Sequence, residues 1–168
     1  LSLYGVFTGM ALPCILFPST VTSSASVILM PSVAEMQALG HRKKIRYITR
    51  TTCTACILLG SLCTTVFYFG GNFAGTILFH NTDAGLYIRT LSFICPFLYT
   101  NIALTSILNG LGKTGTTLVH SVLGILLRIS FVIFAIPVLG IRGYLYGLLL
   151  SEILLSLLHI YALYHMEF

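Results

Sequence analysis

The chain has 168 residues, of which 57% are hydrophobic and only 8% are charged, and its mean hydropathy is +0.97. A soluble domain carries about 25% charged residues, so this chain has too few charges to cover a globular surface in water. The composition excludes a water-soluble enzyme, a nucleic-acid-binding module and a disordered segment, and it predicts a membrane protein. A transmembrane helix takes about 20 apolar residues, so the length allows at most about six or seven spans.

Apolar stretches divide the chain into about five predicted transmembrane helices, so the expected fold is an all-α polytopic membrane protein. Their approximate bounds are 3–36, 51–70, 85–108, 116–138 and 142–164. The first stretch contains Pro13, Pro18 and Pro31, and we expect it to be kinked or broken. A membrane tolerates such a break only where neighbouring helices or water satisfy the freed backbone groups.

Positive charge is concentrated between the first two apolar stretches. The net charge is +5 with His neutral, and five of the nine Lys and Arg residues lie between Arg42 and Arg50. Residues 37–50 are therefore predicted to form a cytoplasmic loop, with contact to anionic lipid as a second interpretation. Alternation of the spans then places Lys113 inside the cell and Arg89 and Arg142 near the outer ends.

Two short motifs match known functional signatures in sequence but lack the neighbouring residues that those functions need. Residues 110–115 match GxGxxG, but a long apolar span precedes them and no acid follows before Glu152, so they are predicted to be turn glycines. Cys53 and Cys56 match CxxC, but no His or acid accompanies them on an apolar face, and a zinc site needs four ligands. We expect packing cysteines, no catalytic residue, no metal site and no cofactor.

Two charged residues, Arg128 and Glu152, lie inside predicted spans. Each costs about 2.5–3.5 kcal/mol at the bilayer centre on the insertion scale. Counted from the turn between the fourth and fifth spans, both lie about 15 Å deep, so the two antiparallel neighbours can pair. In one interpretation the ion pair only joins two helices. In the other, Arg128 faces a water-filled cavity and binds an anionic substrate group when Glu152 releases it.

The candidate substrate-binding residues are Arg128, Glu152, Asn101 and Arg89. Further polar residues of the last three spans could line the same cavity, namely Thr105, Ser106, His120 and His159. A single intramembrane histidine more often makes a hydrogen bond between helices, and that alternative stays open for both histidines.

Several short segments carry a family resemblance as an ordered set. They are GMALP at 9–13 with Phe17 and Pro18, LMPSVAE at 29–35, ILNGLGK at 107–113, Arg128, and GIRG at 140–143 with Gly147. The set resembles the polysaccharide exporters of the stage V sporulation protein B type. This group belongs to the multidrug/oligosaccharidyl-lipid/polysaccharide flippase superfamily. Met36 and Asn109 depart from the residues that the family often has there, which leaves the substrate open.

The resemblance implies a transporter of about fourteen helices in two lobes, with a central cavity and alternating access. This chain corresponds to part of the second lobe, helices eight to twelve. It begins at Leu1 and ends just past the last apolar stretch, so we expect a piece of a larger protein whose N-terminal lobe is its partner.

The implied function is a flippase or exporter of undecaprenyl-linked saccharide or peptidoglycan precursors, in sporulation or in cell-wall or polysaccharide biosynthesis. The implied location is the bacterial inner membrane, and the expected partners are the lipid-linked saccharide and membrane lipids, without nucleic acid. One alternative is a cation-coupled multidrug exporter of the same superfamily. The other is a membrane-embedded glycosyltransferase or ligase, which would need a catalytic acid on a large outer loop.

Overall fold

The structure, a computed structural model, describes residues 3–78, 80 and 82–165. Within these residues the chain is helical and contains no β-strand, which confirms the predicted all-α class. The elements are α1 (Leu3–Val6), η1 (Phe7–Ala11), α2 (Leu12–Leu16), α3 (Ser19–Ala38), α4 (Arg42–Phe73), η2 (Ala74–Leu78), α5 (Thr82–Leu91), η3 (Ser92–Ile94), α6 (Cys95–Gly110), α7 (Thr114–Phe134), α8 (Ile136–Leu139) and α9 (Ile141–His165).

Four helical stretches of the described chain are long and apolar enough to cross a membrane. They are Arg42–Ile77, Ala84–Gly110, Thr114–Phe134 and Ile141–His165. Phe7–Leu16 and Ser19–Ala38 meet at a bend of 52° and pass the same test as a pair, which gives up to five spans. The range of four to five agrees with the predicted polytopic class.

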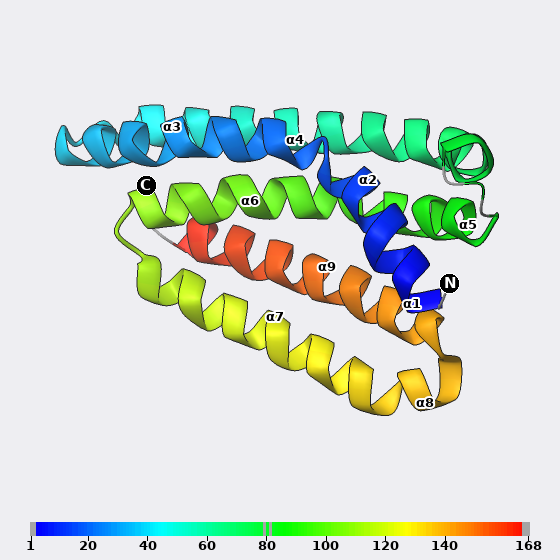
Figure 1. Cartoon of the computed structure of the whole chain (residues 1–168). Coiled ribbons are helices and arrows are strands. Elements are labelled where there is room, and N and C mark those ends of the chain that lie inside the picture. The colour runs from blue at the N-terminus through cyan, green and yellow to red at the C-terminus, as the bar shows by residue number, and fades with distance from the viewer. Residues whose placement is uncertain (1–2, 79, 81, 166–168) are drawn as a thin grey trace.

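Helix α6 lies at the centre of the bundle (Figure 1). It packs against α3 and α4 on one side and against α9 on the other, and α7 packs against the far side of α9. Burial follows this order: 61% of the apolar window of the Ala84–Gly110 stretch is buried, compared with 11% for α4 and 17% for α7. Polar side chains on α6 are therefore enclosed by protein, whereas the outer faces of α4 and α7 are available to lipid.

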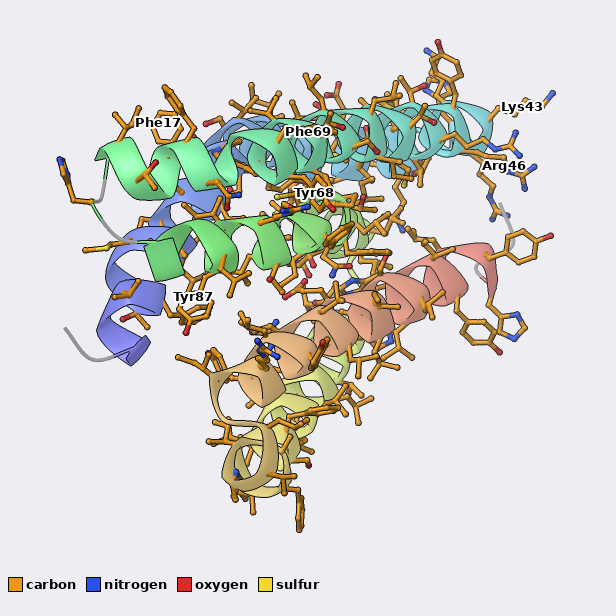
Figure 2. All side chains as sticks on the ribbon, turned by 90° about the vertical axis from the view of Figure 1, so that its right-hand side faces the viewer. Phe17, Lys43, Arg46, Tyr68, Phe69 and Tyr87 are labelled. Atoms are coloured by element: carbon orange, nitrogen blue, oxygen red, sulfur yellow. The ribbon has the colours of Figure 1, made fainter. Side chains whose placement is uncertain are left out.

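The outer faces are apolar, as expected for contact with acyl chains. Phe17 and Phe69 point away from the neighbouring helices in Figure 2, and their exposed fractions are 77% and 78%. The core lies instead around Tyr99 of α6, which is fully buried and donates a hydrogen bond from its hydroxyl to the carbonyl of Ile15 (3.1 Å). Cys56 belongs to the same core, so the second cysteine of the CxxC pair is a packing residue.

The predicted loop over residues 37–50 is wrong at both ends, because α3 continues to Ala38 and α4 begins at Arg42. The turn before it is short. Gly40 adopts a φ of +69°, its amide donates to the carbonyl of Gln37 (3.0 Å), and the His41 amide donates to that of Met36 (2.9 Å). This Schellman arrangement satisfies the last carbonyls of α3, so the next helix can start within four residues. The basic residues consequently lie on a helix, on defined faces.

Only one of the three prolines in the first apolar stretch breaks the helix. The bend lies at Pro18, which has no backbone N–H to donate within a helix. Next to it, the Ser19 hydroxyl donates a hydrogen bond to the Leu16 carbonyl (2.6 Å). Pro31 lies inside α3, which continues through it to Ala38. The bend of 52° confirms the prediction that the first apolar stretch is kinked or broken.

Glycines permit the closest helix contacts. A Cβ on Gly60 of α4 would overlap the Cα of Pro96, at the crossing of α4 and α6. A Cβ on Gly143 would lie 2.8 Å from backbone atoms of Ala135, and one on Gly147 would lie 2.6 Å from the Cβ of Phe131. The GxxxG spacing at 143–147 therefore serves the close approach of α9 to α7 and α8, as small residues do in membrane helix pairs.

Candidate functional site

A polar cluster joins α6, α7 and α9 in the membrane-spanning part of the bundle. We call it the Arg128 cluster, and it consists of Asn101, Arg128, Ser151 and Glu152. Asn101 of α6 is buried and donates from Nδ2 to the backbone carbonyl of Glu152 (2.9 Å) and to its Oε2 (2.8 Å). The same amide group thus holds both the backbone and the carboxylate of α9.

Arg128 of α7 completes the cluster. Its Nη2 forms an ion pair and hydrogen bond with Oε1 of Glu152, and its Nε donates to the hydroxyl of Ser151 (2.7 Å). The predicted pairing of Arg128 with Glu152 is therefore present. The two contacts use two of the five N–H donors of a guanidinium, so further donors are available to an anion.

The two charges differ in how far they reach out of the protein. The side chain of Glu152 is 7% exposed, whereas that of Arg128 is 34% exposed. The carboxylate needs its partners because an isolated charge in hydrocarbon costs several kcal/mol. The guanidinium, by contrast, is partly accessible from outside the helix packing. Chemically, the cluster is a partly exposed arginine paired with a buried acid.

The two intramembrane histidines lie beside each other on α7 and α9, apart from the Arg128 cluster in sequence by about two helical turns. The ring centroids of His120 and His159 are 5.0 Å apart. Among the described residues, neither nitrogen of His159 nor Nδ1 of His120 has a hydrogen-bond partner. The predicted cavity lining by Ser106 is not seen, because its hydroxyl donates to the Ser26 carbonyl of α3 (2.5 Å).

Arg89 lies on α5, away from the other candidates. Its Nη2 donates to the hydroxyl of Tyr68 (2.6 Å), and its guanidinium carbon lies 4.1 Å above the centre of the Tyr68 ring. The tyrosine is placed between α4 and α5 (Figure 2). Arg89 thus connects these two helices, and the structure does not bring it together with Arg128, Glu152 and Asn101.

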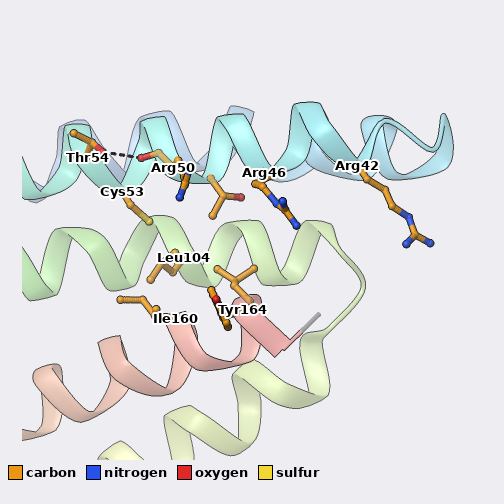
Figure 3. A pocket seen from close by; sticks show the side chains of 10 residues that line it. Arg42, Arg46, Arg50, Cys53, Thr54, Leu104, Ile160 and Tyr164 are labelled. Carbon is orange, nitrogen blue, oxygen red and sulfur yellow. Dashed lines mark hydrogen bonds between the residues drawn. The ribbon is translucent and has the colours of Figure 1, made fainter. Parts of the chain in front are cut away.

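A second cationic feature is a groove between α4, α6 and α9 (Figure 3). Its arginines belong to the segment that was predicted to be a cytoplasmic loop, with contact to anionic lipid as a second interpretation. Its volume is about 1070 Å³. The lining residues are Arg42, Arg46, Thr49, Arg50, Cys53, Thr54, Leu104, Ile160, Leu163 and Tyr164. We call it the basic groove. Its arginines are four residues apart, and this spacing places side chains on one face only in a helix. The expected loop therefore gave no reason to predict a shared face.

The described residues contain no group of three or more His, Cys, Asp or Glu side chains that could hold a metal ion. All five cysteines are free. The candidate site therefore consists of the Arg128–Glu152 ion pair and the Asn101 amide. The arginines of α4 form a separate feature.

Comparison with known proteins gives one informative match. The chain is 24% identical over 158 residues to stage V sporulation protein B of Bacillus subtilis (strain 168), and the match covers 93% of this chain. It spans 30% of the length of that protein. No family model matches the chain, and no solved structure matches it.

The similarity to that protein and the apolar helices of the described residues together indicate a multi-pass membrane protein. The resemblance inferred from short segments is confirmed by this match. The roles of Arg128, Glu152, Asn101 and Arg89 in substrate binding stay predictions.

Proposed function

We propose that the chain is part of a flippase that moves undecaprenyl-linked saccharide or peptidoglycan precursors across the inner membrane of a bacterium. The observation that carries this proposal is the relationship to stage V sporulation protein B along 93% of the chain. It favours a transporter over a membrane-embedded glycosyltransferase or ligase. Transport would proceed by alternating access, with an N-terminal lobe of the same protein forming the other wall of the cavity.

Arg128 is the proposed contact for the phosphate of the substrate. A guanidinium matches the geometry of phosphate oxygens through parallel N–H donors. Its partial exposure supports access by an anionic head group, and the buried Glu152 would hold it in place between transport cycles. Asn101 would keep Glu152 oriented after the guanidinium has moved to the substrate, because its amide bonds to both the carboxylate and the backbone of that residue.

The test is transport of a fluorescent lipid-linked precursor in proteoliposomes that contain the complete gene product. Arg128→Gln combined with Glu152→Gln removes the guanidinium without leaving an unpaired buried charge, and we expect transport to be lost while the protein still inserts. Glu152→Gln alone keeps the guanidinium but removes its acid partner, and it should reduce transport less than the double change does. Both variants are compared at equal helicity by circular dichroism.

Full transport by the double variant would refute the role of Arg128. Transport of cationic drugs in place of the lipid-linked precursor, with Arg128 still required, would refute the proposed substrate class and support the multidrug exporter. Arg128→Lys is a further variant: it keeps the positive charge but loses the planar fork, and we expect reduced transport with normal insertion.

A further inference from the structure

The basic groove has a cationic side and an apolar side. A soluble anion would need only the cationic side. Arg42, Arg46 and Arg50 extend from one face of α4 toward the groove, as Figure 3 shows. The opposite wall is apolar and consists of Leu104 of α6 with Ile160 and Leu163 of α9. A ligand that fills the groove therefore meets positive charge along one side and hydrocarbon along the other.

The arginines form a ladder along one face of α4. They are four residues apart, so the ladder from Arg42 to Arg50 extends about 12 Å along α4. Below Arg50 the lining continues with Cys53 and Thr54, which lie in the apolar part of the helix. The ladder thus leads from the polar end of the bundle into the depth at which acyl chains begin. A phospholipid has a matching arrangement, because its phosphate lies at the membrane surface and its acyl chains extend inward from it.

Two further observations concern the groove itself. Three of the groove's described lining residues are arginines, and none of those described lining residues is acidic. The Thr49 hydroxyl, which also lines the groove, is buried without a hydrogen-bond partner among the described residues. A buried hydroxyl without a partner is uncommon, and an oxygen-rich ligand in the groove would accept its hydrogen bond.

We infer that the basic groove is a binding site for an anionic phospholipid of the cytoplasmic leaflet. The arginines and Thr49 bind the phosphate head, and the apolar wall holds an acyl chain. Because Lys and Arg are enriched at cytoplasmic ends of spans, the groove opens to that leaflet, where anionic lipids attract basic residues by about fivefold in affinity per cation. This site is separate from the Arg128 cluster and does not depend on the proposed transport activity.

The test uses tryptophan fluorescence and brominated lipids. The 168 residues contain no Trp, so Tyr164→Trp places a reporter in the groove. The complete gene product, with any tryptophan elsewhere replaced by Phe, is reconstituted in vesicles of phosphatidylcholine and phosphatidylglycerol, with either lipid brominated. We expect brominated phosphatidylglycerol to quench the reporter with an apparent affinity about 25-fold or more above that of phosphatidylcholine, as two to three cation contacts imply. Phe69→Trp, at the other end of α4, reports bulk lipid and should show no preference.

The variants remove positive charge either from inside the groove or from outside it. Arg42→Gln, Arg46→Gln and Arg50→Gln together should abolish the preference measured by the reporter at position 164. Lys44→Gln, on the same turn of α4 but outside the groove lining, should leave it unchanged. If the triple variant loses helicity, Arg50→Gln alone is measured instead and should lower the preference about fivefold.

Equal quenching by the two lipids at position 164 would overturn the inference, and so would an unchanged preference in the arginine variants. Displacement of brominated phosphatidylglycerol by trace undecaprenyl phosphate would assign the groove to the isoprenoid lipid instead, which also refutes it. Loss of precursor transport with the lipid preference intact would count against the proposed function only, so the two failures are distinguishable.

Discussion

Replacing Arg128 by Ala is expected to cost more stability than replacing Glu152 by Ala, although both changes break the same ion pair. The reason is the difference in exposure, 34% for the Arg128 side chain and 7% for that of Glu152. Arg128→Ala leaves the buried carboxylate with the Asn101 amide but without a cation. Breaking a buried pair in this way costs about 3–5 kcal/mol in free energy of unfolding.

Glu152→Ala leaves the more exposed partner behind. The guanidinium keeps its hydrogen bond to Ser151, and its long side chain can reach toward polar surroundings. The lost charge-assisted bond is worth about 1.5–3 kcal/mol, and the partial exposure of Arg128 lowers this to about 1–2 kcal/mol. The double change removes both charges and should cost less than the sum of the single changes, by about 2 kcal/mol or more.

The assay is unfolding of the purified protein by titration of SDS into mixed micelles, followed by circular dichroism. Ser130→Ala is the matched control on α7, because its exposed hydroxyl bonds only to the Leu126 carbonyl of its own helix among the described contacts. We expect the control to stay within about 0.5 kcal/mol of the unchanged protein. A cost for Glu152→Ala equal to that for Arg128→Ala, or strictly additive costs, would refute the reasoning.

Two further predictions concern packing and orientation. Gly60→Ala should destabilise the protein by about 1–3 kcal/mol in the same assay, because its Cβ would overlap the backbone of Pro96. Gly70→Ala is the control: its Cβ meets nothing within 4 Å, and the change should be neutral or stabilising. Equal stability of the two variants would contradict the close approach of α4 to Pro96. With the native cysteines replaced, Arg142→Cys should react with an impermeant maleimide in intact cells and Lys113→Cys only after permeabilisation. Labelling of both from one side would exclude a spanning α7.

The sequence alone was sufficient for the class of protein and for most of the helices. With 8% charged residues, the chain has to bury its surface in lipid, and apolar stretches of about 20 residues have to be helical because no water satisfies their backbone. The pairing of Arg128 with Glu152 was also predictable, because two opposite charges at equal depth on neighbouring spans lower the free-energy cost of their burial when they form an ion pair. These inferences need only periodicity, length and charge.

Tertiary structure decided which polar residues share a site. Asn101 and Arg89 were equal candidates in sequence, but α6 is enclosed by its neighbours and presents Asn101 to Glu152, while Arg89 bonds to Tyr68 on α4. The helical start at Arg42 depends on the Schellman turn at Gly40, and it places three arginines on one face opposite α9. Contacts between distant segments depend on which helix faces meet, and a local pattern does not contain that information.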